Sequence, residues 1–344
     1  MRQLNGREQE ILRSIVSLYI LKANPVGSRP LSKFLQGQLN LSPASIRNVM
    51  SDLEDMDYRS HPHTSAGRVP TDKGYRFYVD NLMKAKANQN IESESEIENA
   101  LLNFSSMKED SEEILKEASR VLGTLSKYLA VVRIPQFSDL FVQKIELIPI
   151  SSNKVLTVIA LESNIVRTVT LESDFQIETK YLQKINSFIN EKVSGRSLRF
   201  IKDNFINLIS DINIEGTPIV RLFIDSLDKI FLNPKSEKLV TAGTQNLLQH
   251  PEFEDITKVK SIIELVENEN IIIHLLDNLE VVNNNLQVLI GAEMENNILD
   301  DYSVVVSSYR IGSASGSIGL IGPKRMNYPK MMGIVSKVAD ILSK

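Results

Sequence analysis

The chain has 344 residues, more than a single hydrophobic core usually serves, so we expect two or three domains. Its composition is that of an ordinary globular protein, with 42% apolar and 24% charged residues, and it contains no cysteine. The missing cysteine excludes disulfide scaffolds, thiolate nucleophiles and cysteine-ligated metal centres. No apolar run approaches the roughly 18 residues of a membrane helix, and the first residues do not form a signal peptide. We therefore expect a cytoplasmic protein with no membrane partner.

The net charge of −4 hides an asymmetry along the chain. Residues 1–80 hold 11 Lys and Arg against 8 Asp and Glu, whereas the remaining residues hold 28 against 35. A mildly basic small segment joined to an acidic larger one is typical of a local phosphate-binding surface on a globular body.

Two helices are expected before residue 40. Apolar residues repeat at helical spacing from Arg7 to Lys22, and Pro25-Val26-Gly27 ends this first helix. Ser28 can cap a short second helix that runs to about Gln36. The residues expected to be buried by the second helix are Leu31, Phe34 and Leu35.

A third helix is expected to begin at Ser42-Pro43, an N-cap followed by proline at the first helical position, and to end near Met56. One face is apolar at i, i+3, i+4 and i+7, so it packs on a core. The opposite face places Ser45, Arg47 and Asn48 near the N-terminus and the acidic residues in the C-terminal half. A recognition helix presents its N-terminal residues to base edges in this way, although an ordinary solvated helix face has a similar composition.

A hairpin is expected over Tyr58–Thr71, where two short extended pieces flank a Thr-Ser-Ala-Gly turn. A hairpin after a third helix is the wing of a winged-helix domain, and its small polar and basic residues suit contact with phosphates or a minor groove. Thr71 then caps a fourth helix. The residues assigned to contact with the DNA backbone are Arg29, Arg59, His63, Thr64, Ser65 and Arg68.

Beyond residue 83 the pattern predicts an α+β arrangement. Residues 84–108 form a polar linker or connecting helix, and a helical region follows at about Glu109–Leu129. Residues 176–269 are mostly helical, and a last helix covers Pro329–Leu342. The expected strands are Phe141–Ile150, Val155–Leu161, Ile165–Leu171, Ile271–Leu276, Leu286–Ile290, Val304–Tyr309 and Ser317–Ile321. The strands are interrupted by a helical region and then continue. This order indicates one domain at 109–175 and 270–344 with a helical insertion at 176–269.

No residue set indicates catalysis, a cofactor or a metal. The glycine-rich stretch Ile311–Pro323 lacks the Gly-Lys-Ser/Thr ending of a P-loop, so a hairpin turn explains it better than a phosphate cradle. His61 and His63 lack a third ligand, His274 is expected to be a hydrogen-bonded core residue, and His250 a turn residue. No Gly-x-Ser-x-Gly elbow occurs. We therefore expect a protein that is not an enzyme.

Several segments, spread in order over nearly the whole chain, resemble the heat-inducible transcription repressor family (HrcA-type). These segments are Pro25–Arg29, Leu41–Asn48, Pro62–Thr71, Asn246–Phe253, Ile290–Glu293 and Gly319–Met326. The resemblance implies a winged-helix head at 1–83, a GAF-like domain at 109–175 and 270–344, and an inserted dimerisation domain. It also implies a homodimer that represses chaperone operons by binding an inverted-repeat operator in double-stranded DNA. The chaperonin (GroE) is implied as the partner that keeps the repressor active.

One stretch, Asp57–His61, departs from the family pattern, which has a glycine and apolar residues entering the wing. Aspartate is a poorer left-handed helix stop than glycine, whereas Arg59 and His61 would strengthen phosphate contact. In the third helix, Arg47 suits bidentate recognition of guanine and Asn48 of adenine. Two other functions stay open: a winged-helix regulator whose GAF-like domain binds a small effector, and an enzyme with a DNA-binding accessory domain.

Overall fold

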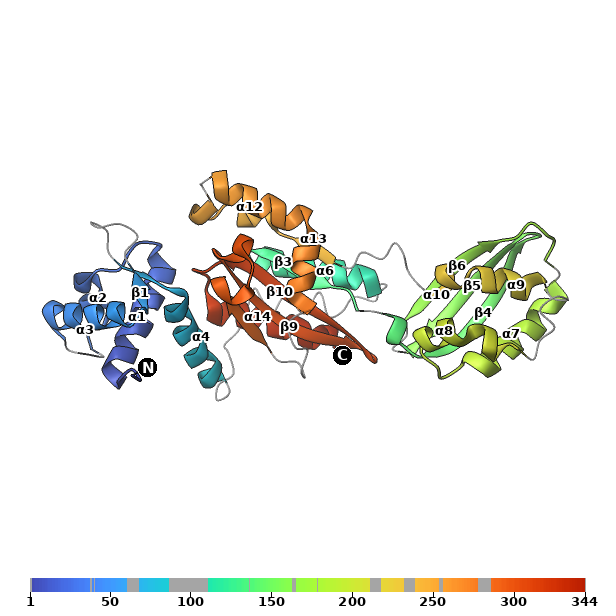
Figure 1. Cartoon of the computed structure of the whole chain (residues 1–344), viewed down its shortest axis with the longest axis horizontal. Helices are drawn as coiled ribbons and strands as arrows, with labels where there is room; N and C mark the ends of the chain where they lie inside the picture. Colours follow the sequence, from blue (N-terminus) through green and yellow to red (C-terminus); the bar gives the residue numbers. More distant parts are fainter. Residues whose placement is uncertain are drawn as a thin grey trace.

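The computed structural model arranges the chain as three bodies that follow one another along its long axis (Figure 1). The residues it describes are 2–37, 39, 41–60, 68–86, 111–135, 137–162, 165–177, 179–210, 218–231, 239–253, 256–277 and 286–343. We call residues 2–86 the head, residues 111–135 together with 239–343 the central body, and residues 137–231 the distal body. All three contain helices, and each also contains strands, so the fold is mixed α+β as expected.

The head is built from helices that start where side chains satisfy free backbone N–H groups. Asn5 and Glu8 form a capping box on the first helix, and Ser42 accepts a hydrogen bond from the N–H of Ser45 on the third. Its elements are α1 (Gly6–Lys22), α2 (Ser28–Phe34), α3 (Pro43–Asp55), β1 (Arg59–Ser60), β2 (Val69–Pro70) and α4 (Asp72–Lys86). These bounds agree with the predicted helices and hairpin.

Two details of the head differ from expectation. Gly27, not Ser28, is the N-cap of α2, and Ser28 is its first residue. Leu31 and Leu35 are fully buried, but Phe34 is 44% exposed, because on this two-turn helix only the i, i+4 stripe reaches the core.

The chain leaves α3 through Asp57, whose φ of 62° lies in the left-handed region. Aspartate therefore adopts the helix-ending conformation for which glycine is better suited.

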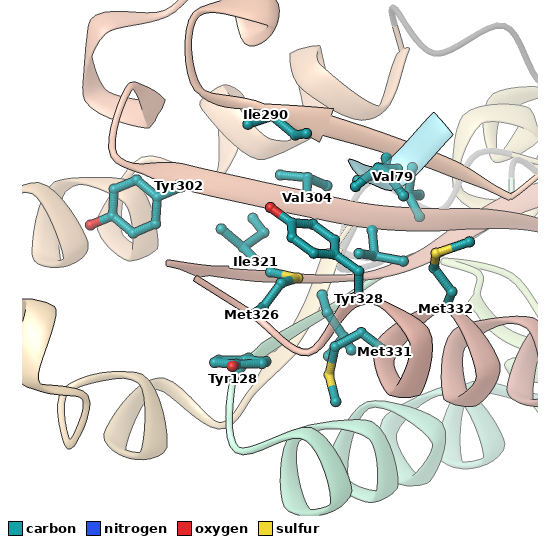
Figure 2. Close-up of a cluster of buried hydrophobic side chains, with 14 of the residues drawn as sticks. Val79, Tyr128, Ile290, Tyr302, Val304, Ile321, Met326, Tyr328, Met331 and Met332 are labelled. Atoms are coloured by element: carbon teal, nitrogen blue, oxygen red, sulfur yellow. The ribbon is translucent and has the colours of Figure 1, made fainter. Parts of the chain in front are cut away.

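The central body is an antiparallel sheet with the strand order β7-β3-β10-β9-β8. Its strands are β3 (Leu129–Arg133), β7 (Leu239–Ala242), β8 (Gln287–Ile290), β9 (Tyr302–Ile311) and β10 (Ala314–Pro323). Its helices are α6 (Ser111–Ser126), α11 (Thr244–Leu247), α12 (Ile256–Glu267), α13 (Glu269–Asp277) and α14 (Tyr328–Leu342), with short 3-10 turns η3 (Pro251–Phe253), η4 (Gly291–Met294) and η5 (Asn297–Leu299). Helices α6 and α14 pack beside each other on the sheet, and Tyr328, Met331 and Met332 of α14 enter its core (Figure 2).

The distal body is a separate antiparallel sheet, in the order β4-β5-β6, with helices on one face (Figure 1). Its elements are η1 (Phe137–Asp139), β4 (Val142–Ser151), β5 (Lys154–Leu161), β6 (Val166–Glu172), α7 (Thr179–Val193), α8 (Leu198–Leu208), α9 (Pro218–Asp225) and α10 (Leu227–Phe231). Two asparagines of α7 bond the outer edge of β4: Asn190 Oδ1 accepts from the N–H of Ile145 (2.7 Å) and Asn186 Oδ1 from that of Leu147 (2.8 Å). This edge strand is therefore covered rather than open to pairing.

The expected limits of the insertion are corrected by this topology. The strands predicted at 141–171 do not join the central sheet but form the distal sheet, whose core they share with α7–α10. Conversely, β7 and α12, which fall inside the expected insertion at 176–269, belong to the central body. The inserted unit is thus residues 137–231, a sheet with helices rather than a mostly helical region.

The expected strand at Ile271–Leu276 is also wrong, because these residues lie in α13. A short continuous apolar run is compatible with either a buried strand or a buried helix face. The hairpin expected at the glycine-rich stretch is confirmed: β9 and β10 pair in register, and Gly312 in the turn has φ 61°.

Candidate nucleic-acid interface

The N-terminal end of α3 is an exposed surface at the extremity of the molecule. Helices α2 and α3 lie at the end of the long axis, away from the central and distal bodies (Figure 1). Arg47 and Asn48 are exposed, as is Arg29 in the first turn of α2. Ser45 is half-buried, and its Oγ lies 3.0 Å from Ser42 Oγ within the N-cap. No part of the chain that the structure describes covers Arg47 or Asn48.

The electrostatics of α3 favour an anion at this end. The first turn of this fully described helix carries no acidic residue, and its backbone N–H groups add the positive end of the helix dipole. The acidic residues Asp52, Glu54 and Asp55 lie in the C-terminal half, as predicted. The helix therefore presents its cationic and amide side chains on the end that attracts phosphate.

The hairpin base packs beside α3. Ser60 pairs with Val69 between β1 and β2, and the N–H of Val26 donates to the carbonyl of Arg68 (2.9 Å), which ties the hairpin to the segment before α2. The predicted contacts His63, Thr64 and Ser65, together with His61, lie outside the described residues.

Glu54 joins the two arginines of the hairpin. Its Oε2 accepts hydrogen bonds from Arg59 Nη2 (2.9 Å) and from Arg68 Nε (2.8 Å). Burial opposes ionisation of Glu54, but the hydrogen bonds from Arg68 and Arg59 outweigh it and lower the pKa of its carboxyl group. Sequence reasoning did not identify Glu54, because no spacing rule connects an acidic residue on a helix to arginines 5 and 14 residues later.

The phosphate contact expected of Arg59 does not fit its position. Its side chain is only 4% exposed and points to Glu54, and burial lowers the pKa of its guanidinium to about 10. We therefore reassign Arg59 from a contact with the DNA backbone to an internal partner of Glu54. Arg68 is 28% exposed, so its side chain is partly accessible at the hairpin base.

The other candidates from the sequence lie apart from this surface. His274, expected in the core, is exposed on α13, because Ile272, Leu275 and Leu276 occupy the buried face of that helix. His250 follows α11 in a turn and stacks on the ring of Tyr128, with centroids 4.8 Å apart. Among the described residues, no group of three His, Asp or Glu is placed to hold a metal ion.

None of the helices described by the structure combines the length and apolar character needed to cross a bilayer.

Comparisons with known proteins agree over nearly the full length. A family model described as the HrcA protein C-terminal domain matches residues 112–332. The heat-inducible transcription repressor HrcA of Chlorobium phaeobacteroides (strain BS1) is 35% identical, and the match covers 99% of this chain and 97% of the relative. The repressor of the same description from Natranaerobius thermophilus is 34% identical over 99% of this chain and 96% of its own length.

A solved structure supports the fold. A crystal structure described as that of a hypothetical protein superposes with a TM-score of 0.68 at 27% identity, covering 99% of this chain and 98% of that chain. With a family model across most of the chain and relatives above 30% identity along its whole length, the chain belongs to the HrcA family of heat-inducible transcription repressors.

Proposed function

We propose that this chain is a cytoplasmic, non-enzymatic repressor of chaperone operons that binds an inverted-repeat operator as a homodimer. The observation that carries the proposal is the uncovered N-terminal end of α3, where Arg47 and Asn48 are exposed and the acidic residues are held behind them. In this proposal α1–α3 with the β1–β2 hairpin form a winged-helix domain, the central body is the GAF-like domain, and the distal body is the dimerisation domain.

The residues of the head divide into two roles. Arg47 can hydrogen-bond guanine O6 and N7 together, and Asn48 can do the same with adenine N6 and N7, so these two read sequence, with Ser45 beside them. Arg29 and Arg68 contact phosphates and set the register without reading bases. The turn residues His63, Thr64 and Ser65 are proposed as wing contacts from the sequence alone.

The distal body supports the homodimer. Its helices cover one face of the β4-β5-β6 sheet, while the other face carries partly exposed apolar side chains, with Ile148 opposite Leu156 and Ala160 opposite Val166, and with Val158 between Glu146 and Thr168. These residues are Ile148, Leu156, Val158, Ala160 and Val166, and we call them the open sheet face. Ile148 is 41% and Val166 53% exposed. A second copy of the same face would cover these side chains by a twofold interface.

Two heads held in one dimer suit an operator with two half-sites, because a single small head buries little specific area. We propose that the dimer populates a head arrangement that fits both half-sites and one that does not, and that the chaperonin (GroE) maintains the first. Adding chaperonin to partly inactive repressor should then raise the fraction that binds operator. No gain in operator binding would contradict this part of the proposal.

A gel-shift series on inverted-repeat DNA tests the DNA-binding proposal. Arg47→Ala should relax base preference and cost about 1–3 kcal/mol on the preferred operator. Arg68→Ala should weaken all sequences alike and lower the salt slope by about one unit. Arg120→Ala is the matched control, since Arg120 is a 65% exposed arginine of α6 in the central body. Equal behaviour of Arg47→Ala and Arg120→Ala on preferred and scrambled DNA would refute the proposal.

A second candidate, a regulator that senses a small effector, is favoured by one cavity. It has a volume of about 540 Å³ and is lined by the head, including Tyr19 and Lys73, and by the central body, including Lys258 and Asp301. Small-molecule sites usually have volumes of roughly 300–1,000 Å³. Calorimetry against a panel of metabolites, followed by a gel shift with any that bind, distinguishes this function from the first.

A further inference from the structure

The head is joined to the central body by charged contacts along α4. Asp72, the first residue of α4, receives a hydrogen bond from Lys324 Nζ at Oδ1 (2.5 Å) and from the N–H of Ala292 at Oδ2 (3.1 Å). Gly291 makes this approach possible: a Cβ on it would lie 2.2 Å from Asp72 Oδ2 and 2.6 Å from Lys324 Nζ. Its φ of 52° is also one that other residues rarely adopt. The first contact is therefore built into the backbone of η4.

A second contact lies one turn further along α4. Arg76 donates from Nε to Glu293 Oε1 (2.7 Å) and from Nη2 to the carbonyl of Val288 (2.6 Å), and Nη2 also reaches Glu293 Oε2. Glu293 is itself held by the N–H of Ile290 (2.9 Å). Burial disfavours the charged form of Arg76, but the pairing with Glu293 outweighs burial and raises its pKa. A planar, two-pronged pairing of this kind fixes direction as well as distance.

A third contact reaches the head from the central body. Arg325 donates from Nη1 to the carbonyl of Ile20 (2.9 Å), in the last turn of α1, where the helix dipole is negative. Glu252 of η3 accepts from Arg325 Nε and holds the guanidinium in place. The Arg325 side chain is only 16% exposed. Arg325 therefore contacts α1, whereas Lys324 and Glu293 contact α4.

Apolar packing fills the space between these contacts. The rings of Tyr75 and Tyr78 on α4 lie 6.2 and 6.4 Å, centroid to centroid, from the ring of Tyr328. Val79 is fully buried beside the central sheet (Figure 2). Apolar packing resists separation but tolerates small rotations, whereas the charged contacts define one orientation. We call Asp72, Arg76 and Arg325, with their partners, the head clamp.

We infer that the head clamp sets the spacing of the half-sites that the dimer accepts, with Asp72, Arg76 and Arg325 as positioning residues rather than DNA contacts. The inference rests on the proposed function. The clamp contacts α1 in its last turn and α4 in its first and second turns. It therefore resists rotation of the head about either helix. The clamped arrangement leaves Arg47 and Asn48 exposed, so it does not occlude the reading surface. In the operator-competent arrangement proposed above, each head is fixed to its body by these contacts, so the distance and phase between the two α3 helices follow from the dimer geometry.

The test uses the full-length dimer and a set of DNAs with identical half-sites whose spacer changes by single base pairs over one helical turn, about 10.5 base pairs. The wild-type protein should bind one spacer best. The variants Arg76→Ala and Lys324→Ala should flatten this profile, reducing the ratio of best to worst affinity by about tenfold, as expected from losing charge-assisted hydrogen bonds. Binding to a single half-site should stay at the wild-type level, which a general loss of head structure would not allow.

The controls separate the possible failures. Arg120→Ala removes an exposed arginine with an ion pair on α6 and should keep the wild-type profile. Arg76→Lys keeps the charge but not the two-pronged geometry, so it should flatten the profile in part and serves if Arg76→Ala does not fold. An unchanged spacer profile in both clamp variants would overturn the inference while leaving DNA binding intact. Tighter binding of the clamp variants to every spacer would overturn it too, because the clamp would then restrain the head from DNA. A wild-type protein that binds no inverted repeat would defeat the proposed function itself.

Discussion

At the scale of single residues, Glu54 is the acidic residue that holds both arginines of the hairpin base. It is the acceptor for buried Arg59, whose Nε and Nη1 have no hydrogen-bond partner among the described residues, and it also holds Arg68. Glu54→Gln removes the charge that compensates a buried guanidinium, so we expect the head to lose about 1–3 kcal/mol of stability. Hydrogen exchange of the α3 amides measures this loss. Asp55→Asn, an exposed neighbour on the same helix, should change the exchange little, and equal effects of the two variants would contradict the assignment.

The same carboxyl group predicts a pH dependence. The pKa of Glu54 in the folded protein is lowered from its ordinary value of 4.5, so its stabilising contribution is complete above that value and is lost as pH falls through the folded pKa. The difference in melting temperature between the wild-type protein and Glu54→Gln should therefore be constant near neutral pH and shrink below about pH 4.5. Circular dichroism melts from pH 7 to 3.5 measure it. A difference that grows on acidification would show that another group is responsible.

The sequence predicts the exposure of some site residues but not of others. The exposure of Arg47 and Asn48 follows from the amphipathic pattern of one helix, because a helix that buries Ile46 and Leu53 must turn those side chains outward. The burial of Arg59 does not follow from any local pattern. It depends on which side of a two-residue strand faces α3, and the pairing of β1 with β2 decides that.

At the scale of elements, the N-cap of α3 connects stability with DNA binding. Ser42→Ala removes the acceptor of the Ser45 N–H (3.1 Å) and should cost about 1 kcal/mol. The first turn, which carries Ser45, would fray, so operator binding should also weaken. Ser42→Asp keeps a good cap but places a negative charge where phosphate is expected, so it should preserve stability and still reduce binding. Paired melting and gel-shift measurements separate the two effects, and wild-type operator affinity in Ser42→Asp would argue against phosphate near this end.

Elements with strong local signals could be predicted, and those defined by distant partners could not. Caps and helical periodicity placed α1 and α3 within one or two residues, and glycine in the turn identified the β9–β10 hairpin. In contrast, β3 and β7 are short strands whose only distinction is their place in the central sheet, with β7 at the edge and β3 beside it. The sequence predicts the distal strands as strands but places them in the wrong sheet. An alternating apolar pattern indicates that one face of a strand is buried, but it does not indicate which element covers that face.

At the scale of the whole molecule, the open sheet face determines the expected assembly. Val166→Asp and Ile148→Asp place a charge beside apolar side chains that a second copy would cover in the proposed dimer, so we expect that dimer to dissociate to monomers. Both side chains are more than one-third exposed in the single chain, so the fold should tolerate the change. Light scattering coupled to size exclusion measures the mass. Ile206→Asp on α8 is the matched control, since Ile206 is 59% exposed but lies on the helical side of the same body.

The monomeric variants also connect assembly to recognition. Their heads are unaltered and far from the substitution, so affinity for one half-site should equal that of the wild-type protein. Affinity for the full inverted repeat should fall towards the half-site value, because the second head then binds as a separate molecule instead of at the high effective concentration within one dimer. If Val166→Asp stays dimeric and binds the inverted repeat as tightly as Ile206→Asp, the two copies meet elsewhere. The distance between the heads would then be set by a different surface.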